Sequence, residues 1–336
     1  MPRTRKDPAL AWLPQRVYVH AKNYVYQPKS GGKIILCSLT ENQITVLNRW
    51  KEVSDKNVGK RKDFETIVNN FFKSPSFNEL SSRTQRDYFS YKVTISGVFG
   101  KMLPNNIAPH NVRQFMDALA TARAKNGKRA NPTANRHKAC LQKICSWALQ
   151  TGLMKTNPCV GVTKLREESR TRYITDMEYE KIFDSSKTLC KAAMELAYLC
   201  MARIEDVTTL ELSALREEGI FIRQGKTKKE QIKSWSPRLK SAVTLAKSLP
   251  LKDGVTRKFL LSKPDGSRYS KRSIQAQYKM ATDTAGIEGC TFHDLKAKGI
   301  SDYEGTLEEK RHTAGHSSIK QTASYDRKIQ IVKPVK

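Results

Sequence analysis

The sequence predicts a mainly α-helical protein with small β elements, an α+β fold, built as three consecutive domains. Three observations support this prediction. Apolar residues recur at helical spacing through residues 64–162. Short runs of β-branched and aromatic residues occur before residue 40 and again between residues 220 and 261. Two charged, polar stretches, residues 54–63 and 163–172, are typical of linkers and separate the three parts.

The first domain, residues 1–55, is expected to hold a small sheet and one helix. Strands are predicted at 16–20, 23–26 and 33–37, with a turn at 30–32 before the last strand. A helix is predicted from residue 41 to residue 50, with Thr40 as its N-cap. Ile44, Val46 and Leu47 are expected on the apolar face of this helix.

Four helices are predicted to form a compact bundle in the second domain, residues 64–162. They are expected at 67–72, 88–99, 109–119 and 131–149. Gly100 and Pro104 end the second of these helices, Pro109 opens the third, and Gly152 ends the fourth. A short basic loop, residues 125–129, joins two of the helices.

The third domain, residues 171–336, mixes helices with short strands. The run at 189–201 is apolar on nearly all sides, so this helix is expected to be buried. Further helices are predicted at 178–185 and 270–284, from residue 292 onward, and after Ser317. Strands are predicted at 220–222, 232–235 and 259–261, the first two flanking a turn at 225–229.

The charge of the chain indicates a polyanionic partner. Lysine and arginine total 61 against 32 acidic residues, a net charge of +29, while 38% hydrophobic residues still allow folded cores. Nucleic acid is favoured over an anionic membrane, because the basic residues are spread through folded segments rather than along one amphipathic helix. A solvated surface is the simpler alternative for any single basic residue. The basic residues expected to be exposed and to contact phosphates are Arg3, Arg5, Lys125, Lys128, Arg129, Arg136 and Lys138.

The sequence also argues against membrane and disulfide-bonded classes. No apolar run approaches the roughly 18–20 residues that a membrane span needs, and the charged N-terminus does not resemble a signal peptide. We therefore expect a soluble intracellular protein. Its seven cysteines include no Cys-x-x-Cys pair, so reduced core thiols are expected instead of disulfides or a zinc site.

Two cations in the third domain have unusual surroundings. Arg203 directly follows the apolar helix and precedes Glu205 and Asp206. Since an isolated charge cannot stay buried, Arg203 must either pair with one of these carboxylates or face an anion. Lys226 lies in the tight turn between two predicted strands, where an ordinary hairpin lysine is the alternative.

The last fifty residues hold the densest set of reactive side chains. Half of the six histidines lie between residues 293 and 316. His293 is followed three residues later by Lys296, and a Gly-His-Ser-Ser sequence carries His316, nine residues before Tyr325. The serines at 317–318 are expected to cap a helix whose third turn carries Tyr325, with its hydroxyl near His316. Taken singly, each of these side chains is more often a packing residue.

Together these residues resemble the tyrosine recombinase family, in particular lambda-like phage integrases. The final block is similar to the closing motif of that family. Residues 135–158 are similar to the last helix of its core-binding (SAM-like) DNA-binding domain, and residues 1–55 to its arm-type DNA-binding domain. The resemblance thus covers most of the chain and identifies residues 171–336 as a mixed α/β catalytic domain. The residues that carry it occur in the order Arg203, Lys226, His293, Lys296, His316 and Tyr325.

The resemblance implies a site-specific DNA recombinase that requires no cofactor, neither metal nor ATP. It implies that Tyr325 attacks the scissile phosphate to form a 3′-phosphotyrosine, while Arg203 binds the nonbridging oxygens. Lys226 would protonate the 5′ leaving group, His293 would assist proton transfer, and His316 would donate to the phosphate. The carboxylate of Asp206, the closer motif match, or of Glu205 would orient Arg203 without contacting the phosphate.

One position departs from the family pattern. The family has a second arginine three residues after its first histidine, and this chain has Lys296 there. A lysine keeps the charge but loses the two-pronged geometry of a guanidinium. Three alternatives follow: Lys296 serves in place of the arginine, a displaced cation such as Lys298 or Arg311 serves, or the protein is a catalytically impaired DNA-binding protein derived from an integrase.

The resemblance also implies which partners the protein binds, and two other enzyme classes fit the sequence less well. The expected partner is double-stranded DNA at attachment sites, bound by a homotetramer, with an excisionase and a host DNA-bending protein as further candidates and no membrane. The expected location is the cytoplasm of a bacterial host, in association with the nucleoid. A type IB topoisomerase shares the chemistry but has no use for an arm-binding domain. A metal-dependent nuclease is disfavoured because the 32 acidic residues form no obvious ligand cluster.

Overall fold

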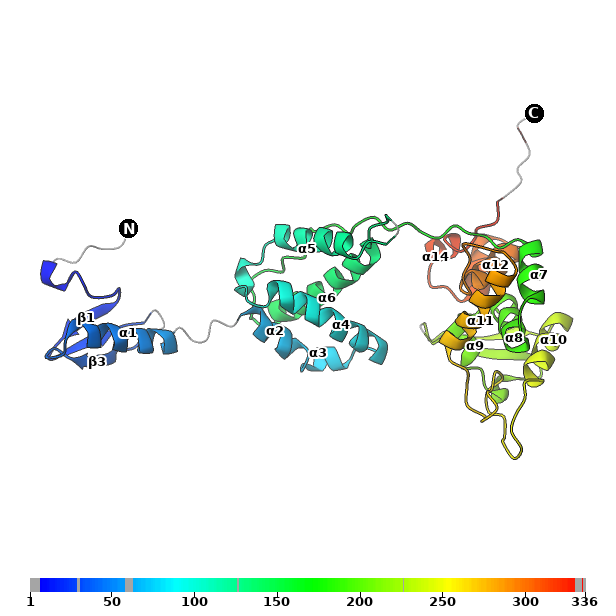
Figure 1. The fold of residues 1–336 in the computed structure, drawn as a ribbon, viewed down its shortest axis with the longest axis horizontal. Helices are drawn as coiled ribbons and strands as arrows, with labels where there is room; N and C mark the ends of the chain where they lie inside the picture. Colours follow the sequence, from blue (N-terminus) through cyan, green and yellow to red (C-terminus); the bar gives the residue numbers. More distant parts are fainter. Residues whose placement is uncertain are drawn as a thin grey trace. The chain divides into compact units, whose positions relative to one another are not determined.

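The computed structural model describes residues 7–28, 31–57, 63–125, 127–225, 227–329 and 334. The chain forms two compact units, residues 1–167 and 168–336 (Figure 1). The first unit contains two separate apolar cores, one within residues 7–57, here called the N-terminal module, and one within residues 63–167, here called the helical bundle. The main core of the second unit lies within residues 174–295. Helices dominate and strands form only small sheets in this part of the chain, so the predicted α+β fold class is confirmed.

The N-terminal module is a three-stranded antiparallel sheet covered by one helix. The strands lie in the order β1-β2-β3, and Val17 pairs with Tyr26 at the start of β1. Val17, Leu36 and Val46 are buried between the sheet and the helix. Gly31 and Gly32 have φ angles of 91° and 84°, which glycine adopts readily, whereas residue 30 of the predicted turn lies outside the described residues. The elements are η1 Pro8–Leu10, β1 Val17–His20, β2 Asn23–Tyr26, β3 Ile34–Ser38 and α1 Gln43–Asn57.

The prediction for α1 was wrong in its cap and its buried face. Asn42, not Thr40, accepts the hydrogen bond of the first turn, from the backbone N–H of Thr45 at 2.8 Å. Val46 is fully buried, but Ile44 is 69% exposed and Leu47 is 40% exposed. The helix also continues to residue 57, so the segment between the two cores begins later than predicted.

The helical bundle contains the four predicted helices and one short helix, α3, that the sequence analysis missed. Three of its N-caps are the side chains of Asp63, Ser74 and Ser81. The amide of Asn135 forms two hydrogen bonds with the backbone of Leu165, at 2.8 and 2.9 Å, and thereby fixes the exit segment to the last helix. The elements are α2 Phe64–Phe71, α3 Pro75–Asn78, α4 Ser82–Phe99, η2 Pro104–Asn106, α5 Pro109–Ala122 and α6 Asn131–Gln150.

One basic residue of the bundle is not where the sequence analysis expected it. Lys138 was predicted to be exposed, but it is only 7% exposed, on the buried side of α6. Its ammonium donates to the side-chain oxygen of Gln142 at 2.9 Å. The alkyl chain of a lysine can pack among apolar neighbours in this way while its charge keeps one polar partner.

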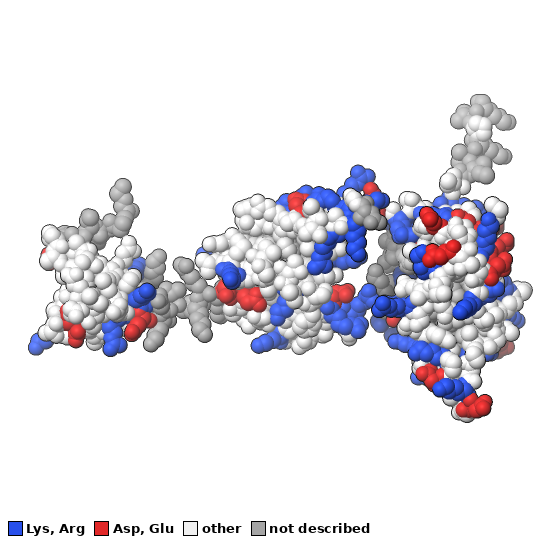
Figure 2. Space-filling model, in the orientation of Figure 1, with Lys and Arg blue, Asp and Glu red and all other residues white. Residues whose placement is uncertain are grey.

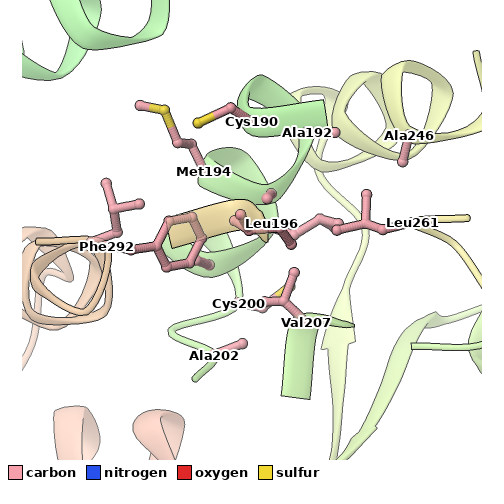
Figure 3. Close-up of a cluster of buried hydrophobic side chains, with 14 of the residues drawn as sticks. Cys190, Ala192, Met194, Leu196, Cys200, Ala202, Val207, Ala246, Leu261 and Phe292 are labelled. Carbon is pink, nitrogen blue, oxygen red and sulfur yellow. The ribbon is translucent and has the colours of Figure 1, made fainter. Parts of the chain in front are cut away.

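The second unit is built around α8, which contacts both α10 and α12. As predicted for an all-apolar run, Ala192, Ala193, Met194 and Leu196 are fully buried. Figure 3 shows Leu196 in this cluster of buried side chains. The elements are α7 Asp176–Asp184, α8 Thr188–Leu199, α9 Ile204–Thr208, η3 Leu212–Ala214, β4 Gly219–Arg223, β5 Glu230–Ser234, α10 Pro237–Lys247, α11 Lys271–Thr284, α12 Asp294–Asp302, α13 Leu307–Ala314 and α14 Ile319–Ala323.

Several local predictions for this unit need correction. The two strands β4 and β5 form an antiparallel hairpin as predicted, with Phe221 opposite Ile232. The predicted third strand at 259–261 is absent from the described residues, where Phe259 makes only an isolated bridge with Glu211. Helices α9 and α10 were not predicted, and the helical stretch predicted from residue 292 onward is divided into α12 and α13. None of the described helices combines the length and apolar character that crossing a bilayer demands.

All seven cysteines lie within the described residues and carry free thiols, and five of them are buried, in agreement with the predicted core thiols.

Truncating the centre of α8 should destabilise the second unit. Leu196→Ala removes a fully buried side chain and should cost about 3 kcal/mol, whereas Met177→Ala, at a side chain 73% exposed, should cost less than about 0.5 kcal/mol. Hydrogen exchange of the α8 peptides, followed by mass spectrometry, measures this loss without requiring the whole chain to unfold in one step. Equal exchange in the two variants would contradict the placement of Leu196 in the core.

Candidate active site

Four segments that are distant in the sequence meet in the second unit. They are the segment between α8 and α9, the start of α12, the residues after α13, and the turn after α14. The ring of Tyr325 lies 5.4 Å from the ring of His293 and 5.0 Å from the ring of His316, measured between centroids. The fold therefore brings together the tyrosine and the two histidines that the sequence analysis singled out.

Tyr325 hydrogen-bonds to His293 and not to His316. Its hydroxyl oxygen lies 2.7 Å from Nε2 of His293. The helix before it, α14, is capped by Ser318 as predicted but ends at Ala323, so Tyr325 lies in the following turn rather than on a third helical turn. The hydroxyl therefore contacts His293, while the ring of Tyr325 lies 5.0 Å from the ring of the expected neighbour, His316.

The backbone around Tyr325 is fixed to its own unit. Ser301 on α12 donates to the carbonyl of Tyr325 at 3.1 Å and accepts from the N–H of Arg327 at 2.8 Å. The guanidinium of Arg327 contacts a carboxylate oxygen of Asp294 at 2.6 Å. These contacts hold the phenol next to His293.

The surroundings of the Tyr325–His293 pair affect both proton affinities. Burial raises the pKa of the Tyr325 hydroxyl, and the charges of Arg203 and Arg327 partly oppose this effect. Partial removal of water from the imidazole lowers the pKa of His293 below its ordinary 6.5, and the charge of Lys296 adds to this shift. At neutral pH His293 is therefore uncharged and has a ring nitrogen that can accept the tyrosine proton.

His316 is buried with one ring nitrogen unsatisfied. Its Nδ1 lies 3.2 Å from the hydroxyl of Thr322, whereas Nε2 has no hydrogen-bond partner among the described residues. Burial, and then the charge of Lys296, lower the pKa of His316 to about 3. Buried polar atoms are nearly always hydrogen-bonded in folded proteins, so Nε2 is a position where a ligand atom can bind.

Arg203 is oriented by an amide rather than by a carboxylate. Its Nη1 donates to Oε1 of Gln224 at 2.7 Å, while the nearest carboxylate oxygen, of Asp206, lies 4.0 Å away. Glu205, the other predicted partner, points elsewhere and pairs with Lys271 at 3.4 Å. Nη2 and Nε of Arg203 make no hydrogen bond with the described part of the chain, which leaves two donors for an anion.

Asp206 fixes the turn that follows β4. Its Oδ1 accepts from the backbone N–H of Gly225 at 2.8 Å. Thr227, on the other side of residue 226, donates to Gln224 at 2.8 Å. Lys226 itself lies outside the described residues, but both of its chain neighbours are fixed beside Arg203.

Lys296 is buried close to Arg203. It is 1% exposed, and its ammonium donates to the carbonyl of Met201 at 2.5 Å and to that of Ala314 at 3.3 Å. Met201 has a positive φ of 50°, an unusual backbone conformation two residues before Arg203. Burial, and then the charges of Arg203 and Lys233, lower the pKa of Lys296 to about 7.

The two displaced cations considered as substitutes are already neutralised. Lys298 contacts the carboxylates of Asp176 and Asp302. Arg311 contacts the carboxylate of Glu308. Among these three cations only Lys296 lacks a carboxylate partner in the described structure.

The sequence analysis missed two polar residues near the site, Gln224 and Lys233. Lys233 on β5 donates to the carbonyl of Thr313, and burial lowers its pKa. The exposed and half-buried residues alternate along β5, so Gln231 and Lys233 share the side that faces α13. Strand periodicity could have placed Lys233 on that side, but no sequence signal identifies the carbonyl it contacts.

The predicted DNA-contacting residues are distributed as follows. Lys125, Lys128, Arg129 and Arg136 are exposed, and Arg129 pairs with Asp117 at 2.8 Å. Figure 2 shows lysine and arginine side chains predominating over acidic ones on parts of the helical bundle and of the second unit. Arg3 and Arg5 lie outside the described residues.

Comparison with known proteins identifies a family domain in the second unit. Residues 172–330 match the model of the phage integrase family. The integrase of Enterobacteria phage 434 is 26% identical over 195 residues, which are 53% of this chain and 53% of that protein. In this match the chain spans about half the length of its relative.

Solved structures agree in fold. A lambda integrase dimer bound to a COC′ core site superposes with a TM-score of 0.70 at 16% identity, covering 96% of this chain and 98% of that one. A lambda integrase tetramer bound to a Holliday junction gives a TM-score of 0.69 at 16% identity, with the same coverage. Together with the family match, these findings lead to one assignment. Residues 172–330 form a domain of the phage integrase family of tyrosine recombinases.

Proposed function

We propose that this protein is a site-specific DNA recombinase that cuts and rejoins DNA through a 3′-phosphotyrosine at Tyr325. One observation carries the proposal: the Tyr325 hydroxyl lies 2.7 Å from Nε2 of His293, in the same unit as Arg203, whose hydrogen bond goes to an uncharged amide oxygen. A phenol, a proton acceptor and nearby positive charge are what the attack of a tyrosine on a phosphodiester requires.

The reaction can be assigned step by step to groups of this chain. The Tyr325 oxygen attacks phosphorus and gives its proton to Nε2 of His293, while the bond from phosphorus to the 5′ oxygen breaks. Nη2 and Nε of Arg203 bind the nonbridging oxygens, and Nε2 of His316 donates to one of them. Lys226, which lies between Gly225 and Thr227 in the sequence, gives a proton to the leaving 5′ oxygen. The reverse step, attack of another 5′ hydroxyl on the phosphotyrosine, rejoins the strand, so no external energy source is required.

Lys296 is proposed to supply the charge that a second arginine provides in the family pattern. Its ammonium donates to the carbonyl of Met201, two residues before Arg203. Lys298 and Arg311, by contrast, are paired with carboxylates. The alternative of an impaired DNA-binding protein finds no support in the Tyr325–His293 pair, which is intact.

The remaining domains are proposed to bind DNA. Residues 1–55 would act as the arm-type domain, residues 64–162 as the core-binding domain, and residues 171–336 as the catalytic domain. The related lambda integrase forms a tetramer on a Holliday junction, and we propose four copies on attachment-site DNA here as well. An excisionase and a host DNA-bending protein are proposed further partners, and the nucleoid of a bacterial host is the proposed location.

Trapping the covalent intermediate tests the proposal directly. A nicked duplex spanning a junction between the encoding element and its host chromosome should form a protein–DNA adduct in the presence of EDTA. Tyr325→Phe should abolish the adduct, because the attacking oxygen is removed, while Tyr303→Phe, a control at a partly exposed tyrosine of the same unit, should leave it. A denaturing gel measures the adduct. Its persistence in Tyr325→Phe, or its absence in the wild type, would favour the binding-only alternative.

Lys296 should make cleavage depend on pH. Lys296→Ala should slow single-turnover cleavage by roughly 100-fold while DNA affinity changes less than about threefold, because the lost charge acts on the transition state. The pKa of Lys296, lowered to about 7, means that the ammonium is charged below neutral pH and loses its proton as pH rises above it. At subsaturating DNA, where the rate reports the protonation of the free protein, wild-type cleavage should therefore fall relative to Lys296→Arg as pH rises above about 7, since arginine stays charged. A constant ratio of the two rates would contradict this role.

Two neighbouring cations on α6 should differ in DNA binding. Arg136 is exposed, so Arg136→Ala should weaken binding and reduce the slope of log affinity against log salt by about 1. Lys138→Met should leave affinity and slope unchanged, because the ammonium is occupied by Gln142 inside the bundle. Titrations of fluorescent DNA at several salt concentrations measure both quantities. A larger effect of Lys138→Met than of Arg136→Ala would contradict the burial of Lys138.

A further inference from the structure

Gln224 connects three segments of the candidate site through one side chain. It follows β4 directly and is 5% exposed. Its Oε1 accepts from Arg203 at 2.7 Å and from the Thr227 hydroxyl at 2.8 Å, and its Nε2 donates to the carbonyl of Ala314 at 2.9 Å. The carboxamide therefore contacts the residue before α9, the turn that carries residue 226, and the last residue of α13.

The neutral charge of this amide matters for Arg203. A guanidinium paired closely with a carboxylate is already neutralised, and an incoming phosphate must compete for it. Here the nearest carboxylate oxygen is 4.0 Å away, and the strongest contact is the uncharged Oε1 of Gln224. The amide fixes the direction of the guanidinium and leaves its positive charge available.

The nitrogen of the Gln224 side-chain amide contacts the end of α13. Ala314 precedes Gly315 and His316, so the bond from Nε2 fixes the backbone from which His316 projects. The packing at this point is close: a Cβ atom on Gly315 would lie 2.2 Å from Nε2 of Gln224. Gly315 also has a φ of 66°, which glycine tolerates. Gln224 thus joins the turn after β4 to the segment of His316.

We propose that Gln224 is a positioning residue for DNA cleavage, which holds Arg203 in its phosphate-binding direction. The inference rests on the proposed recombinase function. It adds a residue that does not touch the DNA but acts through Arg203.

The chain offers a matched control in Gln231. This glutamine lies on the other strand of the same hairpin, is partly exposed, and donates to the carbonyl of His312 at 2.6 Å, also at the end of α13. It has no contact with Arg203 among the described interactions. If joining the hairpin to α13 were the whole role of Gln224, removal of either amide would have a similar effect.

The test compares Gln224→Leu with Gln231→Leu on the nicked duplex. At saturating DNA, Gln224→Leu should slow adduct formation roughly 10- to 100-fold, the range expected for loss of a hydrogen bond to a charged group, with DNA affinity changed less than about threefold. Gln231→Leu should slow it less than about threefold. Gln224→Glu, which keeps an acceptor but adds negative charge, should also be slow, because its carboxylate neutralises Arg203. Wild-type rates for Gln224→Leu or Gln224→Glu, or equal losses for Gln224→Leu and Gln231→Leu, would overturn the inference.

A double-variant comparison shows whether Gln224 acts through Arg203. In an Arg203→Lys background, Gln224→Leu should cost less than about threefold in rate, because the guanidinium that it orients is already gone. A full additional loss would assign Gln224 a purely structural role and overturn the inference. An absence of adduct in the wild type would instead reject the proposed function, so the two failures are distinguishable.

Discussion

Buried positive charge whose hydrogen bonds go to uncharged oxygens is the constraint on which the second unit depends. Removing a cation from water is costly, and proteins usually offset the cost with an acid. In this protein, Lys298 and Lys310 follow that rule and form ion pairs with Asp176 and Asp326, respectively. Arg203 and Lys296 instead donate to an amide oxygen and to backbone carbonyls, and the carboxylate of Asp206 lies 4.0 Å from Arg203, beyond hydrogen-bond distance. The two kinds of buried cation therefore separate structural ion pairs from a site prepared for an anion.

This distinction is visible within a single helix. On α12, Lys296 donates to the carbonyls of Met201 and Ala314, while Lys298, two residues later, contacts carboxylates on a different side of the same helix. The first contact joins α12 to the segments of Arg203 and His316, and the second joins it to the start of α7. The same helix thus contributes one lysine to the candidate site and another to a structural ion pair. The position of the candidate site therefore depends directly on how α12 packs in the unit.

The sequence predicted the elements that follow from repeated local patterns and missed those that depend on single contacts. The apolar run of α8 and the spacing of His316 and Tyr325 were sufficient to predict a buried helix and a tyrosine near histidines. Lys138 was assigned to the surface by its charge, although its spacing from Leu141 and Cys145 places it on the buried face of α6. Gln224 could not be predicted, since its partners come from three segments that only the tertiary fold brings together.

The lowered pKa of Lys296 also links its charge to its ligand. With no anion present, burial and then the charge of Arg203 lower the pKa of Lys296 to about 7, so neutral and protonated forms coexist near that pH. A phosphate bound to Arg203 would place negative charge close to Lys296 and favour its protonated form, because an opposite charge raises the pKa of an amine. DNA binding near neutral pH should therefore be accompanied by proton uptake at this lysine. An arginine, charged at all physiological pH values, could not couple protonation to the arrival of the phosphate in this way.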